Sequence, residues 1–440
     1  PECASMATMP ASAIRLDYPV HTRVLDNGLR VVVSPDHSVP VVAVNLWYDV
    51  GSRDEREGET GWAHLFEHLM FQGSAHVASG EHLHVLQNVG GAVNATTWFD
   101  RTNYFETVPT GALDLALWLE ADRLATLPDH LDEANVETQR SVVKEEKRQR
   151  YDNVPYGEVM THLAELVFPT GHPYAHVTIG SMADLDAATP ERAAEFFRAH
   201  YRPDNAVLTL VGDIGPKDAF KRVEKAFGWI AGWNRRQRPP APALPSLDGR
   251  PSRDVTADVP ADAVYLAWRL PARDTPGFDA ADLALAILGQ GQTSRLHQGL
   301  VRGRAIAAGA TAAALGLIGG NSLGYATVRC LPGITAADAE AALTTELEQL
   351  LAGGPTAAEL RRAKVQYERE WLGELAQLDV RADQFSAYAT LHDDPGRVNR
   401  RLAELAGVTL DDVARAAADL LAPDRAAVLR YHREAADVAS

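Results

Sequence analysis

The chain is poor in cysteine: its 440 residues contain only two, Cys3 and Cys330. Two cysteines cannot build the disulfide framework of a small secreted protein or the four-thiolate site of a structural zinc module. No run of 18 or more apolar residues occurs, so we expect no membrane-spanning segment. Residues 1–13 lack the long apolar core of a signal peptide, and we expect them to be a foreign remnant or a disordered tail. These features favour a reducing, cytoplasmic setting.

Positive charge is also scarce. Lysine and arginine total 42 against 59 aspartates and glutamates, which gives a formal charge of -17. Because phosphate binding needs a basic surface, a nucleic acid is not the expected partner. The hydrophobic content of 46% and the charged content of 23% are ordinary for a globular protein. A chain of 440 residues is too long for one hydrophobic core, so we expect two or more domains.

A repeat divides the chain into two similar halves. The segment TPERAAEFFRAHYRPDNAVLTLVGD begins at Thr189, and TLDDVARAAADLLAPDRAAVLRYHRE begins 220 residues later at Thr409. Each copy has the pattern of an amphipathic helix, a turn at Pro-Asp and a strand rich in valine and leucine. The same offset aligns PVVAVNLWYDV at Pro40 with PADAVYLAWRL at Pro260. We therefore expect an α+β protein of two similar domains, each a mainly antiparallel sheet with helices on one face.

A stretch rich in proline and arginine, without periodicity, separates the two halves and is typical of an extended linker. We expect a first domain over residues 14–228, the linker over 229–254 and a second domain over 255–440. In the first domain, Asn27-Gly28 predicts a tight hairpin turn. The helices that we predict there span residues 60–72, 111–126, 132–150 and 190–200.

The stretch TGWAHLFEHLMFQGS, residues 60–74, places two histidines and a glutamate in an otherwise apolar helical pattern. Polar side chains in apolar surroundings are costly unless they have partners. Because positions i, i+3 and i+4 share one helix face, His64, Glu67 and His68 lie on the same side. Two imidazoles one turn apart can hold one metal ion, with Glu67 beside a water on that ion. The alternative is a pair of core histidines that are hydrogen-bonded to the backbone.

The repeat tests this interpretation from within the chain. At the offset of 220 residues, the three polar positions fall on Ala284, Ile287 and Leu288. The second half keeps the helical pattern with apolar side chains, so the polar residues of the first half indicate chemistry rather than packing. A catalytic zinc commonly takes two histidines plus a carboxylate and leaves a fourth position to water. The charged segment 131–157 is the candidate for the carboxylate, although such a segment alone is more typical of a solvated helix face.

His-x-x-Glu-His, followed roughly seventy-five residues later by a glutamate after two apolar residues, is the inverted zinc motif. With this motif the chain resembles the pitrilysin family, which includes insulin-degrading enzyme and the mitochondrial processing peptidases. It looks closest to the short bacterial members with two repeated domains. The resemblance implies a zinc endopeptidase with one zinc per chain. It spans residues 20–435 and includes GSRDEREGETGWAHLFEHLMFQGS, GGAVNATTWFDRTNYFETVP, QRSVVKEEKRQRYDNVPYG, GHPYAHVTIGS and GQTSRLHQGLVR.

The family pattern places the third zinc ligand four residues after the first of the paired apolar residues. On Val142-Val143 this position is Glu146, with 77 residues between it and the second histidine. Glu145 is the alternative, because its spacing is closer to that of some relatives. Neighbouring helix positions lie about 100° apart and cannot both face one metal, so we choose Glu146. Some relatives have a further acid seven residues earlier, where this chain has Gln139, and we expect no auxiliary carboxylate.

The resemblance also implies roles for other residues. Glu67 would take a proton from the water on the zinc and pass it to the leaving amine. The segment GGAVNATT would be a substrate-binding edge strand, where Asn94 and Ala95 pair with an extended peptide; an ordinary loop and strand is the alternative. Arg302 matches an arginine with which active relatives hold substrate, but the accompanying tyrosine falls on Ala308.

The missing tyrosine determines which partner we expect. Loss of an oxyanion donor typically lowers the rate by a factor of about 10² to 10³. Some bacterial members of the family divide the work between a subunit with the zinc motif and a partner with the arginine–tyrosine pair. We expect this chain to be the zinc-bearing subunit of such a pair, acting on peptides and binding neither nucleic acid nor a membrane. The alternatives are a self-sufficient homodimer and a non-catalytic assembly subunit.

An enzyme of another class shares the helix motif. S-ribosylhomocysteine lyases have a similar His-x-x-Glu-His helix, but they are much shorter and recruit a cysteine. Here no cysteine follows the motif closely, and Cys330 lies in the second half. We therefore favour a peptidase over a lyase.

Overall fold

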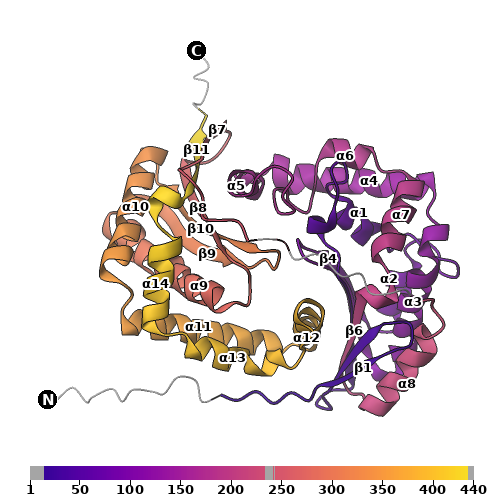
Figure 1. Cartoon of the computed structure of the whole chain (residues 1–440). Helices are drawn as coiled ribbons and strands as arrows, with labels where there is room; N and C mark the ends of the chain where they lie inside the picture. Colours follow the sequence, from indigo (N-terminus) through magenta and orange to yellow (C-terminus); the bar gives the residue numbers. More distant parts are fainter. Residues whose placement is uncertain (1–13, 233–240, 242, 435–440) are drawn as a thin grey trace.

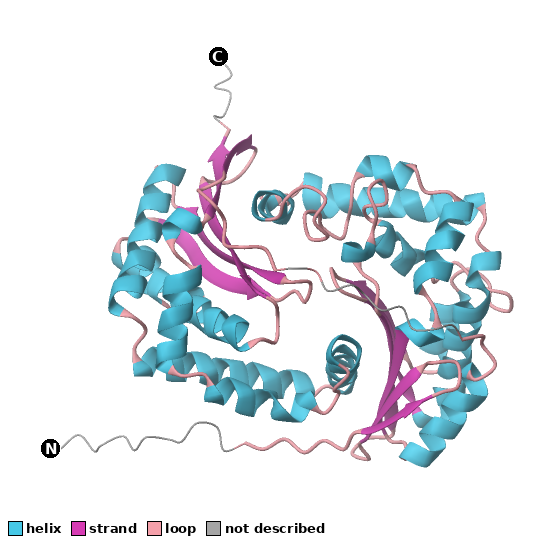
Figure 2. Cartoon of the chain, viewed as in Figure 1, coloured by secondary structure: helices cyan, strands magenta, loops and turns pink. Residues whose placement is uncertain are grey.

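Two β-sheets, one in each half of the chain, are surrounded by helices (Figures 1 and 2). The computed structural model describes residues 14–232, 241 and 243–434. The predicted tail 1–13 and residues 233–240 and 242 of the predicted linker lie outside the described residues. The predicted α+β class with two similar halves is confirmed. None of the described helices has the length and apolar character needed to cross a membrane.

The first sheet has six strands in the order β1-β2-β6-β3-β5-β4. Neighbouring strands are antiparallel except for β2 and β6, which are parallel. The hairpin between β1 and β2 turns at Asn27-Gly28, where Gly28 has a φ of 88° that favours glycine. The strands are β1 (His21–Val24), β2 (Arg30–Pro35), β3 (Val41–Tyr48), β4 (Ala92–Thr97), β5 (Thr102–Pro109) and β6 (Ala206–Gly212).

The second sheet repeats five of the six strands of the first and has no counterpart of β1. Its order, β7-β11-β8-β10-β9, corresponds to β2-β6-β3-β5-β4, and its single parallel pair, β7 with β11, occupies the corresponding place. Strand β7 begins at Ser252, inside the range 229–254 that we predicted to be linker. The strands are β7 (Ser252–Ala257), β8 (Ala263–Pro271), β9 (Ala307–Leu315), β10 (Asn321–Cys330) and β11 (Ala427–Arg433).

Helices cover the outer face of each sheet (Figure 1). In the first half they are α1 (Trp62–Leu69), α2 (Glu81–Asn88), α3 (Leu113–Thr126), α4 (Glu133–Lys147), α6 (Met182–Asp186), α7 (Pro190–His200) and α8 (Pro216–Phe227). In the second half they are α9 (Pro276–Gly289), α10 (Ala336–Gly353), α11 (Ala357–Leu375), α13 (Arg397–Gly407) and α14 (Leu410–Leu420). The four predicted helices correspond to α1, α3, α4 and α7. The third of them, predicted over 132–150, ends as an α-helix at Lys147 and continues as a π-helical turn, Arg148–Asp152.

The two remaining helices are exchanged between the halves. Helix α12 (Leu378–His392) packs on β3 and β6 of the first sheet, where Phe385 joins Ala43, Trp47 and Val207 in one apolar cluster. Helix α5 (Val159–Val167) packs on β8 and β11 of the second sheet. Figure 1 shows both helices between the two sheets. The sequence predicted helices on one face only, but β3 and β6 are apolar on both faces, so each sheet must bury its second face as well.

Hydrogen bonds hold the exchanged helices in place. Asp383 of α12 accepts hydrogen bonds from Trp47 Nε1 at 2.7 Å and Asn103 Nδ2 at 2.9 Å. In the other direction, Arg253 of β7 pairs with Glu165 of α5 at 2.6 Å. The halves are therefore joined by side chains that are distant in the sequence as well as by the connecting chain.

Candidate metal centre

A buried carboxylate fixes the start of helix α1, which carries both histidines. The residue before the helix, Gly61, has a φ of 93° and no side chain with which to cap the helix. Instead Glu55, whose side chain is fully buried, accepts hydrogen bonds from the backbone N–H groups of Gly61 at 3.0 Å and Ala63 at 2.8 Å. His176 Nε2 lies 2.9 Å from the same carboxylate. The first N–H groups of a helix have no internal partner and favour negative charge, so Glu55 satisfies and stabilises them.

The apolar face of α1 determines where its polar residues point. Leu65, Phe66 and Leu69 are completely buried, and the Phe66 ring stacks on Phe196 of α7 with centroids 5.1 Å apart. Fixing this face leaves the opposite face of the helix to the two histidines and Glu67. The two imidazole rings lie 5.0 Å apart and are nearly perpendicular.

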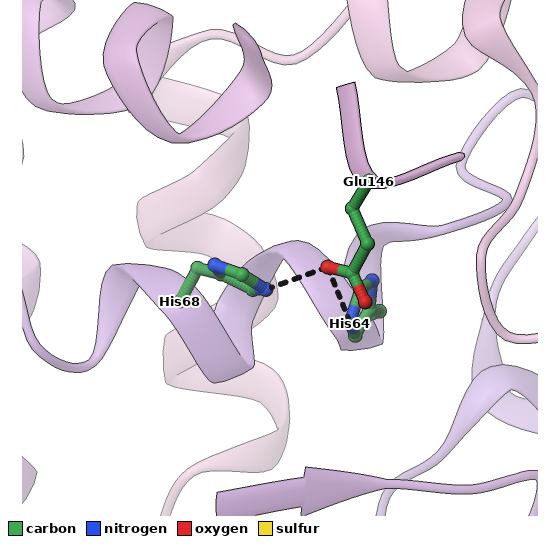
Figure 3. A group of neighbouring side chains, drawn as sticks. All are labelled: His64, His68 and Glu146. Carbon is green, nitrogen blue, oxygen red and sulfur yellow. Dashed lines mark ion pairs between the residues drawn. The ribbon is translucent and has the colours of Figure 1, made fainter. Parts of the chain in front are cut away.

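Helix α4 brings a carboxylate to the histidines. Its buried face includes Gln139 and Val143, and Glu146 follows on that same side. Glu146 Oε2 lies 3.4 Å from His68 Nε2 and 3.7 Å from His64 Nε2 (Figure 3). One ligand atom from each of the three side chains lies within 4.8 Å of the other two. The three residues converge on one point in space.

Glu145 lies away from this cluster. Its side chain is 54% exposed and pairs with Arg148 at 3.2 Å and Gln149 at 2.9 Å. Of the two adjacent glutamates that the sequence left as alternatives, the structure therefore brings only Glu146 to the histidines.

The cluster has the donor set of a zinc site, and the distances from its carboxylate to the two imidazoles are close to those of a zinc site. Two imidazole nitrogens and one carboxylate oxygen are the protein ligands of many catalytic zinc sites. In a tetrahedral site with bonds of about 2.1 Å, neighbouring ligand atoms lie about 3.4 Å apart, and the two distances from Glu146 Oε2 are 3.4 and 3.7 Å. Small adjustments of the side chains would be enough for a zinc ion to bind.

The protonation states also suit a metal. Burial, with a contribution from the nearby His68, lowers the pKa of His64 to about 4, so its imidazole is neutral at pH 7. The hydrogen bond with His68 lowers the pKa of Glu146, and the positive charge of Arg150 adds to this effect. Metals bind the neutral imidazole and the ionised carboxylate. His64 and Glu146 are therefore in their metal-binding forms at neutral pH.

Glu67 lies on the same helix face but has a different environment. Burial raises the pKa of Glu67, and a hydrogen bond with Thr97 opposes this effect. Thr97 is the last residue of strand β4, so that strand supports the carboxylate. A raised pKa brings a carboxylate closer to the range in which it can accept and return a proton.

The sequence did not predict three residues near the centre: Glu55, Thr97 and Arg150. Arg150 Nη1 lies 2.6 Å from Glu146 Oε1. The spacing of four residues between Arg150 and Glu146 is a signal that could have found this contact. Glu55 lies in a loop and Thr97 on a strand, so their proximity to α1 arises only in the folded chain.

The predicted substrate strand lies at an edge of the first sheet. Strand β4 pairs with β5 only, so its other side is an open edge. Asn94 is exposed, and its Oδ1 accepts the backbone N–H of Ala95 at 2.9 Å, whereas the Ala95 side chain is buried. One backbone donor of β4 is thus held by the strand's own side chain.

The structure does not bring the predicted substrate arginine to the histidines. Arg302 is exposed in a π-helical turn, His297–Gly303, beside the second sheet, and within the described part of the chain it has no hydrogen-bond or ion-pair partner. Ala308 is exposed on β9, the edge strand of the second sheet. Ala284, which corresponds to His64 in the repeat, is buried in the second core, as are Ile287 and Leu288.

Comparisons with known proteins identify the family of the chain. The insulinase (peptidase family M16) profile matches residues 30–171, and the peptidase M16 inactive domain profile matches residues 187–367. Zinc protease PqqE of Helicobacter pylori is 31% identical over 89% of this chain and 88% of its own length. Mitochondrial-processing peptidase subunit beta of Bos taurus is 28% identical over 54% of this chain and 47% of its own.

A solved structure extends the likeness to the fold. The crystal structure of a protease from Helicobacter pylori matches with a TM-score of 0.88 and 28% identity, covering 94% of this chain and 99% of that one. The match spans both halves, including the half without the histidines. The resemblance seen in the sequence is therefore confirmed: the chain belongs to the M16 peptidase family and has the two-domain architecture of its bacterial members.

Proposed function

We propose that this chain is a zinc-dependent endopeptidase whose single zinc ion is held by His64, His68 and Glu146. The observation that carries the proposal is the convergence of the three side chains, with Glu146 Oε2 at 3.4 and 3.7 Å from the two imidazole nitrogens. The relatives named zinc proteases support it. The second half supports it as well, because the corresponding positions of its helix α9 are apolar and buried.

Glu67 is the general base in this proposal. Bound zinc would supply Lewis acidity that makes a water molecule more acidic and polarises a peptide carbonyl. Glu67 accepts the proton of that water and returns it to the leaving amine, and its raised pKa suits both steps. Thr97 orients the carboxylate from strand β4. The reaction needs no covalent intermediate.

Strand β4 is the proposed substrate-binding element. An extended peptide would add to its open edge through backbone hydrogen bonds, as in other cases of strand addition. Asn94 must then release the N–H of Ala95, which becomes a donor to the peptide. Recognition of this kind depends on the backbone, so it allows a range of substrate sequences.

We also propose that the chain works as the zinc-bearing subunit of a two-subunit peptidase. Ala308 has no hydroxyl group to stabilise an oxyanion, and the exposed Arg302 makes no contact with the metal cluster. A similar relative carries the name of a subunit, which supports this arrangement. There are two alternatives: a self-sufficient homodimeric peptidase, and a non-catalytic assembly subunit. The cytoplasmic setting stays a prediction from the low cysteine content.

The test is cleavage of unstructured peptides by the zinc-loaded chain, measured by mass spectrometry, with Glu67→Gln as the matched variant. We expect both proteins to bind one zinc, and we expect the variant to lose a factor of about 10² to 10⁴ in kcat/KM. Cleavage by the chain alone would favour the homodimer. Stoichiometric zinc without cleavage would favour the two-subunit or the assembly alternative. A chain that binds no zinc would contradict the proposal.

A further inference from the structure

The two oxygens of the Glu146 carboxylate have different surroundings. Oε2 faces both histidines, at 3.4 and 3.7 Å. Oε1 lies 2.6 Å from Nη1 of Arg150, a distance typical of a strong charge-assisted hydrogen bond. The Glu146 side chain is 18% exposed and that of Arg150 is 74% exposed, so the arginine reaches the carboxylate from the solvent side. One oxygen is thus directed at the cluster and the other is held outside it.

The π-helical turn after α4 positions this arginine. Helix α4 ends at Lys147 and continues into the turn Arg148–Asp152. The other two cations here have partners elsewhere: Lys147 pairs with Asp152 at 2.9 Å and Arg148 pairs with Glu145 at 3.2 Å. Arg150 is the one of the three that is directed at Glu146.

We propose that Arg150 is a positioning residue of the metal centre, which holds Oε1 of Glu146 so that Oε2 alone is presented to the metal. This inference rests on the proposed function, because it needs the cluster to bind zinc. Without the arginine, the carboxylate can rotate and offer both oxygens or neither. Hydrogen bonds to the ligands of a metal fix their orientation, and their loss typically lowers metal affinity about 10- to 100-fold.

The alternative is an ordinary surface ion pair. Exposed pairs contribute little, because solvent screens the charges and ordering two long side chains costs entropy. The chain offers a control in the neighbouring pair of Arg148 with Glu145, an arginine–glutamate pair on the same helical segment in which both side chains are exposed. Removing either arginine deletes one exposed cation, but only Arg150 contacts the cluster.

The experiment measures zinc affinity by competition with a chromophoric chelator for the wild type, Arg150→Met, Arg150→Lys and Arg148→Met. We expect Arg150→Met to bind zinc about 10- to 100-fold more weakly, Arg148→Met to match the wild type, and Arg150→Lys to recover part of the loss. The melting temperatures of the metal-free proteins should agree, which separates metal positioning from folding. Cobalt(II) absorption, which depends on coordination number, gives a second readout.

Equal zinc affinity and equal cobalt spectra for Arg150→Met and the wild type would overturn the inference while leaving the proposed function intact. Equal losses for Arg150→Met and Arg148→Met would also overturn it, since they would indicate a general effect of charge. A wild-type chain that binds no zinc would instead overturn the proposed function. The two failures are therefore distinguishable.

Discussion

At the scale of single residues, burial gives the polar side chains of α1 different proton affinities. It lowers the pKa of His64 to about 4 and raises that of Glu67. Both shifts have the same physical cause, because burial disfavours the charged form of a side chain. The charged form is the protonated one for histidine and the deprotonated one for glutamate. The imidazole is therefore neutral at pH 7, and the carboxylate lies closer to the pH range in which it can exchange a proton.

The raised pKa of Glu67 predicts the acidic limb of the pH–rate profile. Glu67 must be ionised to accept a proton, so kcat/KM of the zinc-loaded protein should fall as the pH drops through a value above 4.5, the ordinary pKa of glutamate. The hydrogen bond with Thr97 lowers this pKa, so Thr97→Val should move the limb to higher pH. A limb that stays in place in Thr97→Val would contradict the role of this hydrogen bond.

His64 predicts how the stability of the metal-free protein depends on pH. In the unfolded chain this histidine takes up a proton near pH 6.5, whereas in the folded protein it does so only near pH 4. Between these values the unfolded state binds more protons, so the free energy of unfolding should decrease as the pH falls from about 6.5 to about 4. In His64→Ala, which copies Ala284 of the second half, urea denaturation should show a shallower decrease over this window. An unchanged slope would contradict the assignment.

The residues of the cluster could be predicted from the sequence in two ways: local spacing pairs the two histidines, and the resemblance to the family indicates the carboxylate. The interval between His64 and His68 defines one face of α1, whereas the choice of Glu146 over Glu145 came from the family pattern on Val142-Val143. The helical face on which a residue lies is a local property. Arg302 could not be placed in the same way, because its distance from the cluster depends on how the two halves pack.

At the scale of elements, α1 depends on a residue outside itself. Glu55 supplies the carboxylate that Gly61 lacks, and its side chain is fully buried. No pattern in the sequence predicts this cap, because the loop between Glu55 and the helix follows no period. The start of α1, and with it the direction of His64, is fixed by tertiary structure.

This dependence predicts a loss of stability in Glu55→Ala. The substitution leaves the N–H groups of Gly61 and Ala63 without their acceptor in a buried site, which should lower the free energy of unfolding by about 2 kcal/mol. Glu57→Ala, at an exposed position of the same loop, should change it by less than about 0.5 kcal/mol. Chemical denaturation of both variants measures the difference, and equal stabilities would contradict the capping role.

At the scale of the whole molecule, the repeat was predictable but the exchange of helices was not. The offset of 220 residues follows from matching helices and strands, and the two strand orders agree with it. Periodicity shows which residues of α12 are apolar, but not which of two similar sheets they cover. That choice is made by contacts between segments more than 150 residues apart, such as Asp383 with Trp47.

The exchange predicts that the two halves unfold together. Phe385 of α12 is fully buried against the first sheet, so Phe385→Ala should lower the free energy of unfolding by about 3 to 5 kcal/mol. Val365→Ala, on an exposed position of α11, serves as the control. Because each sheet is covered by a helix of the other half, far-UV circular dichroism and tryptophan fluorescence should report one transition in the variant. Two separate transitions would contradict this coupling.

The exchanged helices have a consequence for the origin of the chain. When α5 is shifted by the repeat offset of 220 residues, it falls within α12. Helix α12 covers β3 and β6, and α5 covers β8 and β11, which are the corresponding strands of the second sheet. Two identical copies that swapped one helix each, about a twofold axis, would have this arrangement. The chain thus has the architecture of a domain-swapped homodimer whose two copies became joined end to end. Only the first copy of the repeat carries the histidines, and the second supports it through α12.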